Sequence, residues 1–286
     1  MSFDPHWLDL RARFDDQARD RDVLQRFISV LPSHPRLIDL GCGNGANLRH
    51  LSPALGARQS WVLVDHDRAL LADVPRASPA WVGAAGGALQ RHADGFTIDL
   101  ISRAVDVRLV QADLAADLEH LAVEDCDGVV ATALLDLTSA AWLDRLAALL
   151  VSHARPSLWT LTYDGRMAFT PAHAADAVIV EAFNADQRRD KGFGPALGPV
   201  SAPYLAGRLG DAGFALQKAT SDWQIPAHDS AMLSAMVDGI AAAARMAAAD
   251  QRAAIDAWQA RRTQEIAANG LRMRIGHLDL LALPPK

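Results

Sequence analysis

The stretch from Leu37 to Asn47, LIDLGCGNGAN, constrains this chain more than any other part of the sequence. Its first four residues have the length and the apolar character of a buried parallel strand. Gly41, Gly43 and Gly45 permit positive φ angles and a close approach of the backbone to a ligand. From Asn47 to Leu55, leucines recur at helical spacing. The stretch therefore predicts a strand that turns through a glycine loop into a helix, with space for a ligand on the loop.

An acidic residue ends the next predicted strand, about twenty residues beyond the last glycine. The apolar run Trp61 to Val64 stops at Asp65. In a βαβ unit, an acid at this place presents its carboxylate to the two hydroxyls of a nucleoside ribose. Three glycines alone would fit an ordinary turn equally well. Together with the strand and the acid, they predict a nucleoside-containing ligand.

The acid inside the loop motif separates two classes of ligand. A dinucleotide site has the pattern G-x-G-x-x-G and holds a pyrophosphate at the start of the helix. Here Gly45 falls one residue too early for that pattern. The sequence Asp39-x-Gly41-x-Gly43-x-Gly45 resembles the first motif of class I S-adenosylmethionine-dependent methyltransferases, and the resemblance covers roughly residues 36 to 165. S-adenosyl-L-methionine has an amine and no phosphate, so a carboxylate near the loop suits its cationic end.

The resemblance implies an α/β fold with a doubly wound, seven-stranded, mostly parallel sheet, an antiparallel last strand, and helical or loop insertions that cap it. We expect an N-terminal helical cap at residues 1–35 and a cofactor-binding domain at residues 36–286. Insertions are expected at about 75–96, 164–200 and 228–269, the last a helical hairpin that packs internally or contacts another copy of the chain. Beyond the glycine unit, strands are expected at 96–103 and 107–110, paired as a hairpin, then within 126–137, and at 158–162, 214–224 and 274–283.

The resemblance also implies which residues hold the cofactor. Asp113 is expected to accept a hydrogen bond from the adenine amino group, with the backbone of Leu114 against the ring, and it can cap the following helix as well. His66 follows Asp65 towards the adenosine, and Thr132 is the polar side chain where the strand of the fourth motif ends. The expected cofactor-binding set is Asp39, Gly41, Cys42, Gly43, Asn44, Gly45, Asp65, His66, Asp113, Leu114 and Thr132.

Catalytic residues are less clearly marked than the cofactor site. Ligands of open α/β sheets bind beyond the carboxyl ends of the strands, so Tyr163 and Asp164, after the fifth strand, are expected to face the site. Lys191 lies in the polar, glycine-rich segment 184–199, which is either a lid that hinges at its glycines or an exposed connector. Asp164, Tyr163 and Lys191 are therefore the candidate catalytic residues, and Asp136 and His173 lie near the same mouth.

Residues 4 to 31 predict one or two amphipathic helices that end before Pro32. Arg11, Asp15 and Arg19 follow one another at intervals of four residues. They form ion pairs along a solvated helix face, or one arginine meets the carboxylate of the cofactor. The second possibility follows from the resemblance, because the leading helix of class I methyltransferases often closes over the cofactor.

The composition of the chain limits the classes of partner that it can bind. A net charge of −6 argues against a nucleic acid, whose binding depends on clustered Lys and Arg. Cys42 and Cys126 are too few for a disulfide framework and indicate buried thiols in a reducing compartment. No run reaches the ~20 apolar residues of a membrane span, and the first residues do not form a leader pattern. We therefore expect a cytoplasmic protein that is a monomer or a homodimer.

The sequence as a whole predicts methyl transfer from S-adenosyl-L-methionine to a small-molecule acceptor, with S-adenosyl-L-homocysteine as the product and no metal ion. A methyltransferase of RNA or protein is one alternative. A non-catalytic module that binds S-adenosylmethionine or another nucleoside is a second, and a dinucleotide-dependent oxidoreductase is a third. The spacing of the residues does not choose the acceptor, its reacting atom or a general base.

Overall fold

The computed structural model describes residues 4–77, 82–83 and 86–286. Seven strands form the core of its sheet in the order β5-β2-β1-β6-β7-β10-β8. Neighbouring strands from β5 to β7 are parallel, and β10 runs antiparallel to both β7 and β8. The predicted doubly wound sheet with an antiparallel last strand is therefore confirmed. The core strands are β1 (Arg36–Leu40), β2 (Arg58–Asp65), β5 (Arg103–Gln111), β6 (Gly128–Thr132), β7 (Ser157–Thr170), β8 (Ala215–Thr220) and β10 (Arg272–Leu283).

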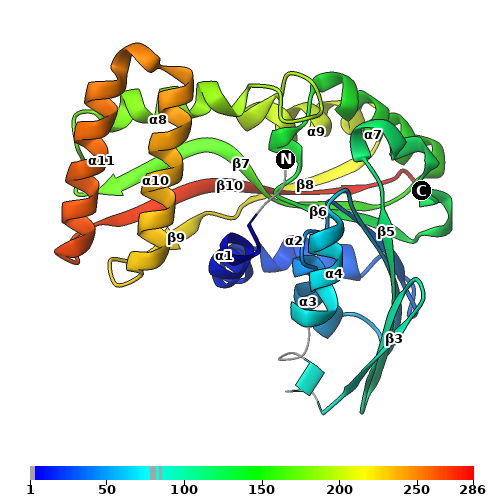
Figure 1. Ribbon diagram of the computed structural model, residues 1–286. Helices are drawn as coiled ribbons and strands as arrows, with labels where there is room; N and C mark the ends of the chain where they lie inside the picture. The colour runs from blue at the N-terminus through cyan, green and yellow to red at the C-terminus, as the bar shows by residue number, and fades with distance from the viewer. Residues whose placement is uncertain (1–3, 78–81, 84–85) are drawn as a thin grey trace.

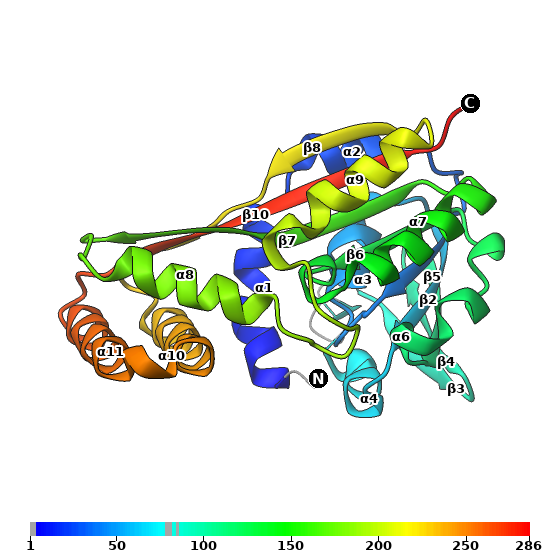
Figure 2. The same ribbon diagram turned by 90° about the horizontal axis from the view of Figure 1, so that it is seen from above.

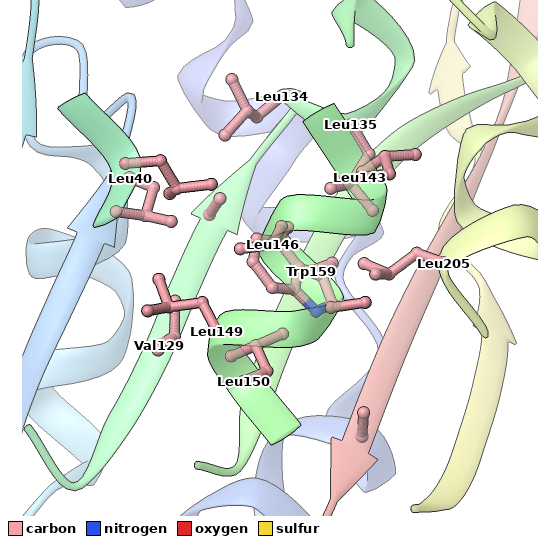
Figure 3. Packing of buried hydrophobic residues seen from close by; sticks show 14 of the residues in the cluster. Leu40, Val129, Leu134, Leu135, Leu143, Leu146, Leu149, Leu150, Trp159 and Leu205 are labelled. Atoms are coloured by element: carbon pink, nitrogen blue, oxygen red, sulfur yellow. The ribbon is translucent and has the colours of Figure 1, made fainter. Parts of the chain in front are cut away.

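Helices cover both faces of this sheet because the central strands are apolar on both sides. In β1, Leu37 packs into one buried cluster, whereas Ile38 and Leu40 pack into another. The helices α2 (Arg21–Ile28), α3 (Ala46–Leu51) and α4 (Arg68–Ala77) contribute to the first cluster. The helices α6 (Leu114–Asp117), α7 (Ala140–His153) and α9 (Ser201–Asp211) contribute to the second. Figure 3 shows leucines of α7 and the indole of Trp159 filling the space between β6 and α9.

The sheet continues well beyond this core as a second, smaller lobe. Strands β7 and β10 extend past the other strands, and β9 (Trp223–Ile225) pairs with β10 there. The helices α8 (Asp176–Gln187), α10 (Ser230–Ala247) and α11 (Arg252–Ala267) cover one face of the extension and share a buried cluster with it. Helix α1 (Pro5–Ala18) crosses between the α10–α11 pair and the core of the sheet (Figures 1 and 2). The expected helical hairpin at 228–269 therefore packs within the chain.

The fifth strand was predicted to end at Thr162, and this boundary is wrong. Strand β7 continues to Thr170, because the first half of β10 supplies a pairing partner as far as Arg272. Tyr163 and Asp164 therefore lie inside a strand and not in a loop after it. Gly165, with a φ of 88°, sits opposite a register shift in the ladder, so the glycine that resembles a turn marks an irregularity within the strand.

Other predicted boundaries also need correction. Residues 88–92 form strand β3 (Ala88–His92), which pairs with β4 (Gly95–Leu100) at the edge of the sheet, so this part of the 75–96 insertion does not cap the glycine loop. Residues 78–81 and 84–85 of that insertion lie outside the described residues. The hairpin between β4 and β5 turns at residues 101–102, earlier than the expected 104–106. The predicted strand 214–224 is divided into β8 and β9 at Ser221 and Asp222.

Short 3-10 helices complete the path: η1 (Ser52–Ala54), η2 (Leu118–His120), η3 (Val123–Asp125), η4 (Leu135–Leu137), η5 (Gly198–Val200) and η6 (Ala249–Gln251). Cys42 and Cys126 are free and buried, as the sequence predicted. Within the described ranges, the helices are too short or too polar to cross a membrane.

Candidate cofactor site

The glycine loop joins β1 to α3 with positive φ angles of 67° at Gly41, 54° at Gly43 and 83° at Gly45. A Cβ on Gly43 would meet only the side chain of Leu8, at 3.4 Å. A Cβ on Gly45 would instead approach Val74 of α4 to 2.9 Å. Gly41 and Gly43 line a cavity, whereas Gly45 allows the loop to pack against α4.

Asp65 ends β2 beside this loop, and its carboxylate organises the backbone around it. The backbone N–H of Gly43 donates to Oδ2 at 2.8 Å, and that of Asp67 donates to Oδ1 at 2.9 Å. His66 Nδ1 lies 3.2 Å from Oδ1. A carboxylate offers about four lone-pair sites, so two amide donors leave acceptor capacity for a ligand. Asp65 therefore holds the loop and faces the cavity at the same time.

A cavity of about 260 Å³ lies at the carboxyl ends of the parallel strands, where open α/β sheets bind ligands. A smaller cavity of about 60 Å³ adjoins it, and the two share Leu8, Arg11, Gly41, Gly43 and Thr132. We call the two together the crevice. The larger part is lined by Leu8, Arg11, Gly41, Gly43, Asp65, His66, Leu70, Asp113, Leu114, Thr132, Ala133, Leu134, Leu137, Lys191, Gly192 and Phe193. The smaller part adds Asp15, Asp39, Cys42, Asn44, Ala46 and Asn47.

The crevice gathers ten of the eleven residues expected to bind the cofactor, all except Gly45. Asp113 caps α6 through a hydrogen bond from the amide of Ala115, so its capping role is present beside its place in the lining. Asn44 is held by hydrogen bonds to Asp9 of α1 and from Arg49.

Asp39 lies in the smaller part of the crevice and is almost fully buried. Its Oδ1 accepts a hydrogen bond from Asn47 Nδ2 at 2.8 Å. Its Oδ2 has no hydrogen-bond partner within the described part of the chain. Burial raises the pKa of Asp39 to about 7, although Asn47 and the charge of Arg19 act in the opposite direction. A buried carboxylate with one open oxygen is suited to a cationic hydrogen-bond donor such as an ammonium group.

Arg19, at the end of α1, is buried behind this carboxylate. Its guanidinium donates to Asn47 Oδ1 at 2.6 Å and to Thr132 Oγ1 at 3.1 Å. Thr132 in turn donates to Asn47 Oδ1 and shares a hydrogen bond with Thr160. Arg19 therefore braces the walls of the crevice from behind and is not among its lining residues.

Arg11 makes the expected ion pair, but not on a solvated helix face. It forms an ion pair with Asp15, four residues later, with nitrogen–oxygen distances of 3.0 and 3.2 Å. It also lines both parts of the crevice, and its guanidinium lies 4.9 Å from the ring centroid of Trp223. Only 11% of its side chain is exposed, so the pair is buried rather than on a solvated face.

The far wall of the crevice is formed by the segment around Lys191. The Lys191 ammonium lies 2.8 Å from Asp186 of α8. Phe193 packs edge-on against Trp142, with 5.2 Å between the ring centroids. Asp190 accepts hydrogen bonds from the amides of Gly192 and Gly194. This part of the 184–199 segment is therefore ordered against the rim of the crevice.

Two candidate catalytic residues lie outside the lining of the crevice. The Tyr163 hydroxyl donates to Asn184 Oδ1 at 2.8 Å, and burial raises its pKa. Asp164 accepts from Arg166 Nε at 2.7 Å, and Arg166 also reaches Asp222. Both side chains thus have partners within the small lobe, which the unexpected length of β7 explains. His173 lies before α8, where its ring accepts from the amide of Ala175.

Asp136 is a buried carboxyl in η4, between the lining residues Leu134 and Leu137. Its Oδ1 has no hydrogen-bond partner among the described residues. Burial raises its pKa to about 6, and the nearby charges of Arg11 and Lys191 act in the opposite direction.

Leu8, Asn47 and Leu70 belong to the site although no sequence motif marks them. Leu8 reaches the loop from α1, and Leu70 reaches it from α4, so each contact depends on how a helix packs. Asn47 lies in the first turn of α3, and its contact with Asp39 likewise depends on how the helix packs against β1.

Neither a protein-family model nor a curated protein matches this sequence. Among solved structures, the chain is similar to an S-adenosylmethionine-dependent methyltransferase from Geobacter sulfurreducens in complex with S-adenosyl-L-homocysteine (11% identity, 99% of each chain covered, TM-score 0.46). It is also similar to a methyltransferase from Thiobacillus denitrificans with the same ligand (13% identity, 99% of this chain and 100% of the other, TM-score 0.44). A third is the cyclopropane synthase MmaA2 from Mycobacterium tuberculosis (14% identity, 97% and 98% covered, TM-score 0.45). Likeness at this level does not identify a reaction, so the function has to be argued from the site.

Proposed function

We propose that this protein transfers a methyl group from S-adenosyl-L-methionine to a small-molecule acceptor, bound in the crevice. The observation that carries the proposal is the joint placement of three groups around one cavity. The backbone of Gly41 and Gly43 is open to a ligand, Asp65 stands beside the loop, and Asp39, whose buried Oδ2 has no partner among the described residues, lines the smaller part. A ligand that is a nucleoside at one end and a cation at the other matches this arrangement.

The residues present fit S-adenosyl-L-methionine along its whole length. Asp65 would accept hydrogen bonds from the ribose hydroxyls, and Asp113 with Leu114 would hold the adenine. Asp39 would accept from the ammonium group through its open oxygen, with Arg11 near enough for the carboxylate. This ligand contains no pyrophosphate. Its lack of phosphate charges suits a glycine loop that has two acids, Asp39 and Asp65, close to it.

The acceptor would occupy the other end of the crevice. The lining of the crevice includes the apolar side chains of Leu137 and Phe193 together with Lys191, and we assign the acceptor to this part. The larger cavity, about 260 Å³, falls below the range of about 300–1,000 Å³ usual for ligand pockets, so housing a cofactor and an acceptor together requires one wall to move. The segment 190–194 supplies that wall, and Gly192 and Gly194, with φ angles of 106° and 83°, provide hinge positions. We therefore favour a lid over an exposed connector.

The chemistry that the cofactor supplies is an electrophilic methyl group on a sulfonium. The contribution of the protein is to align the acceptor in line with that methyl group and to exclude water. Thr132 and Ala133 hold the floor of the crevice between the glycine loop and the acceptor end. If the acceptor must lose a proton, Asp136 is the candidate base, because its buried Oδ1 has no partner among the described residues, whereas Tyr163 and Asp164 are already engaged.

A small acceptor suits this site better than RNA or a protein. The crevice is narrow and covered by α1, and the net charge of the chain is −6. The test is a metabolite screen with S-adenosyl-L-methionine that carries tritium in its methyl group. We expect label to appear in a small product together with S-adenosyl-L-homocysteine. Binding of the cofactor without transfer to any fraction would favour a non-catalytic module, and transfer only to macromolecules would favour the RNA or protein alternative.

A further inference from the structure

A second hollow, of about 610 Å³, lies on the other side of α1 from the crevice. Leu8 and Arg11 of α1 line the crevice, whereas Arg13, Phe14 and Gln17 line this second hollow. Its volume lies within the range of about 300–1,000 Å³ typical of small-molecule sites. We call it the arginine groove. Its remaining lining residues are Ala168, Thr170, Gln224, Ile225, Pro226, His228, Asp229, Arg272, Met273 and Arg274.

The floor of the arginine groove is the polar face of the extended sheet. Arg272 and Arg274 alternate along β10, so they project from the same face. In the ladder they stand opposite Thr170 and Ala168 of β7, and Arg274 also stands opposite Gln224 of β9. Alternate residues such as Ile275 belong to the buried cluster under α10 and α11. Helices therefore cover the apolar face of the small lobe, and the face with the arginines is left hollow.

The charges in the groove are unbalanced. Arg13 forms an ion pair with Asp229, and both residues line the groove. Arg274 lies 3.8 Å from Asp222, but that carboxylate is already bound by Arg166 at 2.7 Å. Arg272 has no ion pair within the described ranges 4–77, 82–83 and 86–286.

Three arginines thus line one hollow, and Asp229 is the one carboxylate that the described residues add to its lining, in a chain with a net charge of −6. Each guanidinium presents a planar fork of N–H donors that matches the oxygens of a phosphate or a carboxylate. Gln17, Gln224 and Thr170 add side chains that hydrogen-bond to polar ligands.

We propose that the arginine groove binds a small, multiply charged oxyanion, with Arg272 and Arg274 as its main contacts. The ligand chemistry is that of a phosphate ester or a polycarboxylate with a polar body. A long polyanion fits less well, because Asp229 lines the groove, Asp222 lies beside Arg274, and the arginines do not continue as a stripe. This site is separate from the proposed methyl-transfer site, and the two proposals stand or fall independently.

The test is a calorimetric titration of the full chain with inorganic pyrophosphate and, separately, with citrate. At least one of the two should bind, and which one binds distinguishes a phosphate ligand from a carboxylate ligand. Saturation with S-adenosyl-L-homocysteine should not displace the anion, because the two sites lie on opposite sides of α1. The double variant Arg272→Ala/Arg274→Ala should bind at least about ten-fold more weakly, since it loses two charged hydrogen-bond donors.

A matched control is Arg91→Ala/Arg252→Ala, which removes two exposed arginines outside the groove lining. It should bind the anion as the unchanged protein does. The variant Arg272→Lys/Arg274→Lys keeps the charge and should retain part of the affinity. The proposal is overturned if neither anion binds at up to about 10 mM. It is equally overturned if the Arg272→Ala/Arg274→Ala protein, folded and binding S-adenosyl-L-homocysteine normally, loses no more affinity than the control.

Discussion

Asp65 Oδ2 lies 2.8 Å from the backbone nitrogen of Gly43, so the acid that ends the second strand also fixes the glycine loop that follows the first. These two residues are far apart in the sequence, but parallel pairing of β1 with β2 brings their strand ends together. The proposed ribose contact and the shape of the loop therefore depend on the same carboxylate.

Asp65→Ala should weaken S-adenosyl-L-methionine by about ten-fold or more, because charged hydrogen bonds in buried sites are the strong kind. The variant should remain folded but melt a few degrees lower, since the amides of Gly43 and Asp67 lose their acceptor. Calorimetry measures the first effect and circular dichroism the second. Asp106→Ala, on an exposed position of β5, is the control and should change neither. Undiminished affinity in Asp65→Ala would show that Asp65 does not hold the ribose.

Gly43→Ala should abolish cofactor binding with a small loss of stability. The φ of 54° places the new side chain in the left-handed region, at a cost of about 1–2 kcal/mol. Gly213→Ala is a matched control, because its φ is 85° and, apart from its chain neighbours, no described residue has an atom within 4 Å of the added Cβ. It should carry similar backbone strain and bind the cofactor normally. Equal binding by the two variants would mean that Gly43 does not touch the ligand.

Asp39 should make the apo protein less stable as the pH rises. Its pKa is about 7 in the folded state, against 3.8 for an unperturbed aspartate, so between these values the folded state holds a proton that the unfolded state has released. The contribution of Asp39 to the free energy of unfolding is fully present below pH 3.8. Between pH 3.8 and pH 7 it falls by up to about 1.4 kcal/mol per pH unit. Denaturant unfolding at pH 5 and pH 8 measures the change. Asp39→Asn, which cannot ionise, should lose less stability over that interval.

The same carboxyl should link cofactor binding to pH. An ammonium group beside Oδ2 favours the ionised form of Asp39, so binding should tighten between pH 6 and pH 8 relative to Asp39→Asn. Calorimetry in two buffers of different ionisation enthalpy would detect the released proton. An identical pH profile in both proteins would place the amine elsewhere.

Lys191→Ala should loosen the segment 190–194 and reduce turnover once an acceptor is known, with little change in cofactor affinity. The variant loses the ion pair with Asp186, in which both side chains are only 10% exposed. Tryptic cleavage at Arg188 and Arg189 should therefore become faster than in the unchanged protein, and S-adenosyl-L-homocysteine should slow it in both. Arg252→Ala, at the start of α11, provides the comparison. If neither the ligand nor the substitution changes the rate of cleavage, the segment is an exposed connector and not a lid.

Local patterns explain how much of the site was predictable. The glycine loop, Asp65 and Asp113 lie at or just after the carboxyl ends of the neighbouring parallel strands β1, β2 and β5, so all three come to the same edge of the sheet. Gly45 shares the motif but lies against Val74, a contact that no spacing reveals.

Long-range pairing explains what the sequence did not predict. Strand β7 continues past Thr162 only because β10, more than a hundred residues later, pairs with it as far as Thr170. Once β7 is extended, Tyr163 and Asp164 point to partners in the small lobe and leave the crevice. The cover that α1 forms over the crevice also depends on long-range packing, because the packing of α1 brings Leu8 to Gly43.

The most direct test of the central claim is a calorimetric titration of the chain with S-adenosyl-L-homocysteine beside one with NADH. The geometry of Asp39, Gly43 and Asp65 predicts one S-adenosyl-L-homocysteine site per chain, weakened by Asp65→Ala, and no binding of NADH. Binding of NADH without binding of S-adenosyl-L-homocysteine would contradict the account and identify the glycine loop as a dinucleotide site.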